Sequence, residues 1–173
     1  VVDCADAAIA FVRASLSERP GDKPAGAGVD APLWWSSGPS GDRRADQWLR
    51  SHYGLSGGEV QTTNSLRGAA IAQAAMFVQR LREQFPSVGV TEAHPKVLLK
   101  ILGKGNWGTF CRRFDIDAAT PTEDERDAII AAVAAREGFQ RNWRNDLSKK
   151  RTPAEQNPKT YHLAPVHYYW PSK

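Results

Sequence analysis

The sequence has few of the residues that hold small secreted or zinc-binding domains together. It contains only two cysteines, Cys4 and Cys111, which lie far apart in the chain. This excludes a disulfide framework and a zinc site built on thiolates. It also lacks a secretory leader and any long apolar run, so we expect no transmembrane helix. Together these absences predict a cytoplasmic protein in a reducing environment.

The chain is not dominated by charge of one sign. It carries 23 Lys and Arg against 19 Asp and Glu, which gives a formal net charge of +4. A modest basic excess is compatible with nucleic acid as a partner but does not require one. With 173 residues, of which 41% are hydrophobic, the chain is long enough to bury a core of its own.

The spacing of apolar residues predicts the order of the elements. We expect helices over 6–16, 43–53, 65–85, from 95 onward, around 110–114 and over 122–136, and strands over 25–29 and 88–92. Gly138 is expected to close the last of these helices. The resulting fold class is α/β, with a small mixed or parallel sheet flanked by helices in residues 1–139. Residues 140–173 form a basic, aromatic tail that we expect to pack on the same domain, as loop over 140–159 and as a strand or extended arm over 161–170.

Both predicted strands end in a carboxylate that is soon followed by proline. Asp30 ends the first strand before Pro32, and Glu92 ends the second before Pro95. Proline cannot donate to a sheet, so each strand stops there. The carboxyl ends of parallel strands meet at one edge of a sheet, where open α/β folds place their ligand sites. We therefore expect the two carboxylates to lie close together.

A third acidic group heads the helix over 122–136. Asp124 and Asp127 are three residues apart and so share one face of its first turns. Together with Asp30 and Glu92 they form a set of hard oxygen ligands suited to Mg²⁺ or Mn²⁺. The alternative is that each acid has a separate structural role, as a turn residue, an ion-pair partner or a helix-start charge.

Basic residues near these acids are the candidates for substrate contacts. Arg43, Arg44 and Arg50 form either a solvated helix face or a phosphate-facing cluster. His94 is either a proton shuttle or the structural N-cap of the helix that begins at Pro95. In the loop before these arginines, Trp34 and Trp35 could stack on nucleobases, but we favour a role as buried anchors of the loop.

Five motifs occur in an order and spacing that resemble a known family. They are Gly28-Val29-Asp30-Ala31-Pro32-Leu33, Arg43-x-x-Asp46-x-x-Leu49-Arg50, Thr91-Glu92-Ala93-His94-Pro95, Asp124-x-x-Asp127-Ala128 and Tyr168-Tyr169-Trp170-Pro171. The chain in this respect is similar to the predicted RNase H-like nucleases, a family long catalogued as a domain of unknown function. The resemblance covers nearly the whole chain. It implies a ribonuclease H-like fold.

The resemblance also implies an activity, namely metal-dependent hydrolysis of phosphodiester bonds in nucleic acid. Asp30, Glu92, Asp124 and Asp127 would be the catalytic metal ligands, with Mg²⁺ or Mn²⁺ as cofactor. Members of that family usually open with a Gly-x-Asp strand and a hairpin that are not visible here. Asp3 has too little strand before it to replace them. We therefore expect the N-terminal strands either to be missing from this chain or to have been lost in this member.

Two other functions remain compatible with the sequence. One is a catalytically silent RNase H-like module that binds nucleic acid or a protein partner, with its sheet completed by strand addition. The other is a phosphatase or nucleotide hydrolase that uses the same carboxylates, because a fold does not fix a function.

Overall fold

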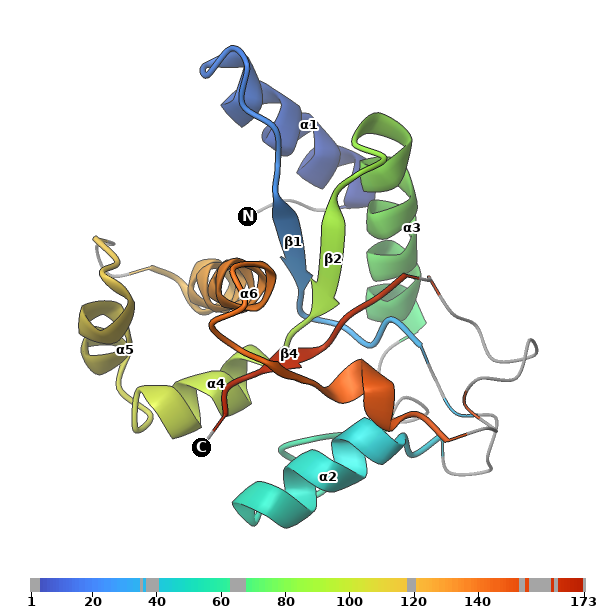
Figure 1. Ribbon diagram of the computed structural model, residues 1–173, viewed down its shortest axis with the longest axis vertical. Helices are drawn as coiled ribbons and strands as arrows, with labels where there is room; N and C mark the ends of the chain where they lie inside the picture. Colours follow the sequence, from blue (N-terminus) through green and yellow to red (C-terminus); the bar gives the residue numbers. More distant parts are fainter. Residues whose placement is uncertain are drawn as a thin grey trace.

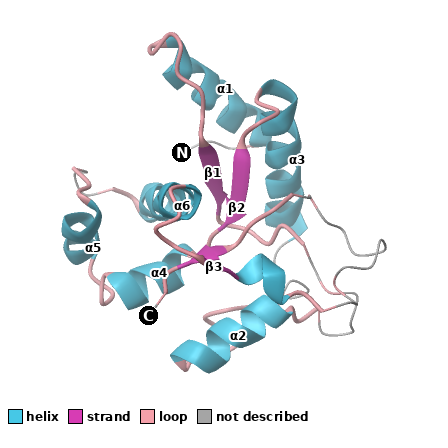
Figure 2. Ribbon diagram, in the orientation of Figure 1, coloured by secondary structure: helices cyan, strands magenta, loops and turns pink. Residues whose placement is uncertain are grey.

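The computed structural model describes residues 4–34, 36, 41–62, 68–117, 121–152, 155, 163 and 165–172. Within these residues the chain is mixed α/β (Figures 1 and 2). Its helices are α1 (Ala5–Ser17), α2 (Arg44–Tyr53), α3 (Gly68–Gln84), α4 (Pro95–Leu102), α5 (Trp107–Phe114), α6 (Glu123–Phe139) and the 3-10 helix η2 (Leu147–Lys150), and its strands are β1 (Gly26–Val29), β2 (Gly89–Glu92), β3 (Asn145–Asp146) and β4 (Tyr169–Trp170). These bounds confirm the α/β prediction and the order of elements up to residue 139. The expected starts at 65–67 and Asp3 lie outside the described residues.

The central pair of strands is parallel, as predicted. β1 pairs with β2 so that Val29 lies opposite Glu92, and Figure 1 shows the two strands side by side and pointing the same way. On the other edge of β2 the tail joins the sheet through His167, which donates its N–H to Val90 O and accepts from Glu92 N, both at 2.9 Å. The far edge of β1 has no strand partner within the described residues.

Glycines in the strands allow α6 to pack directly on the sheet. A Cβ added to Gly28 would lie 1.8 Å from the carbonyl oxygen of Ala131, and one added to Gly26 or Gly89 would meet the ring of Phe139. Only a residue without a side chain permits this approach. The consequence is that the beginning of α6 lies beside the carboxyl end of β1.

The end of α6 differs from the expectation. Gly138 does not close the helix, which continues through Phe139. A Cβ at Gly138 would lie 2.1 Å from the ring of Tyr169. Gly138 therefore makes room for the tail, and the left-handed residue that follows the helix is Arg141.

The tail is more ordered than the sequence suggested. Within 140–159, where loop was expected, the chain forms β3 and η2, and β3 pairs antiparallel with β4. The arm expected over 161–170 is a strand only at Tyr169–Trp170, while 161, 162 and 164 lie outside the described residues. Tyr168 and Trp170 are fully buried, so the tail contributes to the same core as the helices. In the described part of the chain, no helix has both the length and the apolar character needed to cross a membrane.

Candidate functional site

Two carboxylates face one hollow where β1 ends and α6 begins. Asp30 directly follows β1, and Asp127 lies one turn into α6. A capping box fixes the start of this helix, because the Thr122 hydroxyl accepts from Glu125 N and the Glu125 carboxylate accepts from Thr122 N at 2.8 Å. Asp30, Asp124 and Asp127 line the same hollow, which has a volume of about 380 Å³. The predicted meeting of Asp30 with the α6 acids is therefore present in the structure.

The hollow disfavours negative charge on both carboxylates. Burial, followed by the charges of Asp127 and Glu92, raises the pKa of Asp30 to about 7, although the outer side of Asp30 still meets solvent. Burial also raises the pKa of Asp127. Oδ1 of Asp127 is buried and has no hydrogen-bond partner. It lies 3.5 Å from Arg126 Nε, beyond a good hydrogen bond.

These carboxylates suit a hard divalent cation. Asp127 offers a buried oxygen that makes no hydrogen bond and lies 3.5 Å from Arg126 Nε. A nearby positive charge would stabilise the Asp30 carboxylate, and the exposed Asp124 also lines the hollow. Among the described residues, no group of three or more His, Cys, Asp or Glu side chains is arranged to hold a metal ion. Mg²⁺ is often held by only one or two protein carboxylates together with water and substrate phosphate. The residues present fit that kind of site.

Glu92 has different partners from those expected of a metal ligand. Its two carboxylate oxygens accept from Arg43 Nη2 at 2.6 Å and Arg43 Nη1 at 2.8 Å. Oε2 also accepts from Leu33 N at 3.0 Å. Glu92 is 3% exposed. In this structure Glu92 therefore ties the end of β2 to the loop that follows Asp30.

Arg43 is a buried structural cation. It is 1% exposed, and its Nε and Nη2 also donate to Asp46 at 2.7 and 2.8 Å. Its Nη1 donates to the carbonyl oxygen of Trp34, and its guanidinium lies 4.4 Å from the centre of the Trp34 ring. Trp34 is fully buried, as the sequence predicted, and Arg151 also lies 5.1 Å from its ring, whereas Trp35 lies outside the described residues.

The three arginines do not form one phosphate-facing cluster. Arg44 is exposed, and its backbone N–H donates to Glu155 Oε1 at 2.7 Å. The Arg50 side chain makes two 2.6 Å contacts with Asp42 and donates to Val60 O. Each arginine thus lies in a different local network.

His94 lies beside Asp30 in a second hollow, of about 280 Å³. It occupies the N-cap position of α4, but its side chain makes no cap hydrogen bond. Its Nδ1 is buried without a partner, and burial lowers the pKa of the imidazole to about 4. At neutral pH the ring is therefore uncharged.

Two features of the structure were missed by the sequence reasoning. Lys96 lines the second hollow together with Asp30, and its place directly after the motif that ends at His94-Pro95 was the available signal. The other is a pair formed by Asp146 Oδ2 and His167 Nδ1 at 2.9 Å. Twenty-one residues separate these two, and no sequence pattern indicates their contact.

Comparison with protein-family models, curated proteins and solved structures finds no match to this chain. No family is shown. The resemblance to the RNase H-like nucleases therefore remains a prediction that rests on the motifs.

Proposed function

We propose that this protein is a divalent-metal-dependent nuclease that hydrolyses phosphodiester bonds of nucleic acid. One observation carries the proposal: Asp30 and Asp127 share a hollow in which burial raises the pKa of both, and one buried oxygen of Asp127 makes no hydrogen bond beyond its 3.5 Å ion pair with Arg126. Such a pair is costly to keep unless a cation or a substrate uses it. The motif order of the sequence supports the same function.

Asp30 and Asp127 would hold Mg²⁺ or Mn²⁺, with Asp124 at the rim of the hollow. A bound ion would supply charge stabilisation at the phosphate and an activated water. His94 is uncharged at neutral pH and has a buried free nitrogen beside Asp30. A pKa of about 4 makes the imidazole a weak base at neutral pH, so we assign His94 no proton transfer, and it forms part of the wall of the hollow. Glu92 and Arg43 act by positioning the loop that carries Asp30.

The test is cleavage of labelled single- and double-stranded DNA and RNA with Mg²⁺, Mn²⁺ or EDTA. We expect metal-dependent cleavage that falls at least about 100-fold in Asp30→Asn and in Asp127→Asn. Asp115→Asn is the control, because Asp115 ends α5 in a left-handed conformation that Asn also adopts, and it does not line the hollow. Activity that survives both Asp30→Asn and Asp127→Asn contradicts the proposal.

The same assay separates a nuclease from a phosphatase or nucleotide hydrolase. We expect oligonucleotides to be cleaved faster than a mononucleotide is hydrolysed. The reverse order would assign the carboxylates to a phosphomonoesterase.

A second candidate function is a catalytically silent module that binds nucleic acid or a protein. The observation that favours it is that both carboxylate oxygens of Glu92 accept hydrogen bonds from Arg43. Fewer carboxylates are then available to bind a metal ion than the sequence predicts. Salt-sensitive binding of an oligonucleotide without cleavage in any metal would support this candidate.

A further inference from the structure

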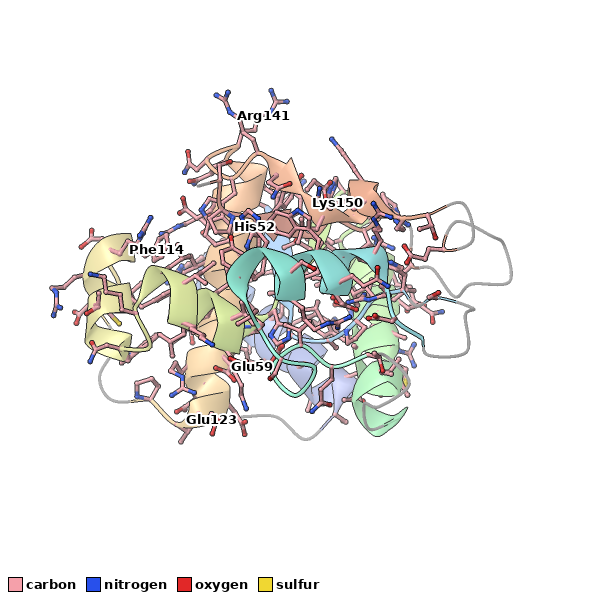
Figure 3. The ribbon with its side chains drawn as sticks, turned by 90° about the horizontal axis from the view of Figure 1, so that it is seen from below. His52, Glu59, Phe114, Glu123, Arg141 and Lys150 are labelled. Atoms are coloured by element: carbon pink, nitrogen blue, oxygen red, sulfur yellow. The ribbon has the colours of Figure 1, made fainter. Side chains whose placement is uncertain are left out.

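Lys96 is a cation at the edge of the candidate site. It is the second residue of α4 and lines the hollow that also contains Asp30 and His94. Its side chain is 68% exposed, and its Nζ lies 2.9 Å from Glu123 Oε1 at the start of α6. Figure 3 shows Glu123 at the end of the molecule opposite Arg141, away from the basic tail.

Arg43 also lines this hollow, but all three of its guanidinium nitrogens already donate hydrogen bonds within the protein. Its Nε, Nη1 and Nη2 all donate to carboxylates or to a carbonyl within the protein. It is also 1% exposed, so a substrate cannot reach it without breaking a buried network. Among the described residues, Lys96 has a single ion-pair partner, the exposed Glu123. Exposed ion pairs of this kind contribute little to stability, so Lys96 can change partners easily.

A substrate phosphate needs a positive charge in this place. The hollows beside Asp30 contain several carboxylates, and a phosphodiester adds another negative charge to them. The ammonium group of lysine carries three donors on a flexible stem and binds phosphate as a point charge. The position of Lys96 at the mouth of the hollow lets it meet a strand that approaches Asp30 from solvent.

We propose that Lys96 leaves Glu123 and binds the oxygens of the phosphodiester that is cleaved. This rests on the nuclease function proposed above. Lys96 is then a catalytic residue in direct contact with the substrate. In the free protein its ammonium group is paired with Glu123.

The chain provides a matched control on the same helix. Lys100 lies one turn after Lys96, is 54% exposed and is paired with Glu59, as Lys96 is with Glu123. Lys100 itself does not line the hollow, although its partner Glu59 does. Lys96→Met and Lys100→Met therefore remove the same charge and the same kind of surface ion pair, and only the first removes a cation from the site.

The first measurement is binding of a fluorescent single-stranded oligonucleotide with saturating Ca²⁺, followed by anisotropy at several salt concentrations. We expect Lys96→Met to weaken binding at least about 5-fold and to reduce the slope of log K against log salt by about 0.7, as loss of one phosphate contact requires. Lys100→Met should leave both the affinity and the slope unchanged. Equal affinities and slopes for the two variants overturn the proposal.

The second measurement is cleavage with Mg²⁺. We expect Lys96→Met to lower kcat/KM at least about 10-fold, Lys96→Arg to restore part of it, and Glu123→Gln to retain activity. Loss at Asp30→Asn with none at Lys96→Met would leave the nuclease function standing and overturn the role of Lys96. Lys96-dependent binding without any cleavage would overturn the nuclease function and the catalytic role of Lys96, and would leave Lys96 as a phosphate-binding residue only. An unmodified chain that neither binds nor cleaves overturns both proposals.

Discussion

Asp30 and Glu92 end neighbouring parallel strands in the same way, yet their surroundings give them different roles. Glu92 meets a buried guanidinium and is held by short charge-assisted hydrogen bonds. Asp30 meets other carboxylates, and Lys96 is the cation that lowers its pKa. The identity of the nearest charge therefore decides which carboxylate is structural and which is available for chemistry.

The raised pKa of Asp30 predicts how stability depends on pH. The pKa is about 7 in the folded chain and near 3.8 in the unfolded one. Between these values the folded state keeps a proton that the unfolded state has released, so this group's contribution to stability falls as pH rises from about 4 to about 7. Asn cannot titrate. We expect Asp30→Asn to gain stability relative to wild type over this window, by on the order of 1 kcal/mol because solvent screens the exposed side.

Urea unfolding of both proteins at pH 4.5, 6 and 8, followed by circular dichroism, measures this difference. The stability gap should widen steadily with pH in EDTA. A gap that is the same at pH 4.5 and pH 8 would contradict the assignment of this pKa to Asp30. Adding Mg²⁺ at pH 8 should stabilise the wild type more than the variant, because a ligand that binds only the folded state stabilises it.

At the scale of elements, the contact of α6 with β1 builds the site. The two elements approach closely because Gly28 has no side chain where the backbone of Ala131 lies. Asp127 is one helical turn before Ala131 and Asp30 is two residues after Gly28, so this contact sets the spacing of the two carboxylates. The precision of the site depends on a glycine that has no chemistry of its own.

We expect Gly28→Ala to destabilise the fold by about 3 kcal/mol or more, because the added methyl overlaps backbone that cannot move alone. Gly57→Ala is the control. Gly57 has nothing within 4 Å of an added Cβ, so its stability should change by no more than about 0.5 kcal/mol. Thermal melts of both variants check this, and equal melting temperatures would be inconsistent with the close contact. A folded Gly28→Ala should also lose cleavage activity as α6 shifts.

At the scale of the whole molecule, the tail completes the core. β4 packs against α6, His167 extends the sheet beside β2, and Trp170 Nε1 donates to the Tyr53 hydroxyl at 2.9 Å. Elements from both ends of the sequence thus share one buried interior. The tail is therefore a structural part of the domain. Its Arg141, Arg144 and Lys149 are exposed, whereas Arg151 is half-buried against Trp34.

Trp170→Ala should destabilise the protein by about 3–5 kcal/mol, since it removes a fully buried indole and leaves a cavity. Phe11→Ala provides the comparison, because Phe11 is 66% exposed and its loss should cost no more than about 0.5 kcal/mol. Chemical unfolding monitored by far-UV circular dichroism gives both values. Similar costs for the two aromatic residues would mean that the tail does not belong to the core.

Local pattern was enough to predict most of the elements and half of the candidate site. Apolar periodicity, Pro95 and the acidic start at Thr122 act through neighbours in sequence, so α1 to α4, α6 and the two parallel strands followed from them. The meeting of Asp30 with Asp127 also followed, because strand ends and helix starts have predictable places in α/β folds. The role of Gly138 did not follow, since a glycine that caps a helix and one that admits a ring look alike in sequence.

By itself, therefore, the sequence determined the α/β class and placed the acids at strand ends and at a helix start. Only the tertiary structure decided that Arg43 donates hydrogen bonds to Glu92 and Asp46, that Lys96 lines the hollow beside Asp30, and that the tail pairs with β2. These are contacts between residues far apart in the chain. They depend on distances, burial and competing charges in three dimensions, which no local pattern encodes.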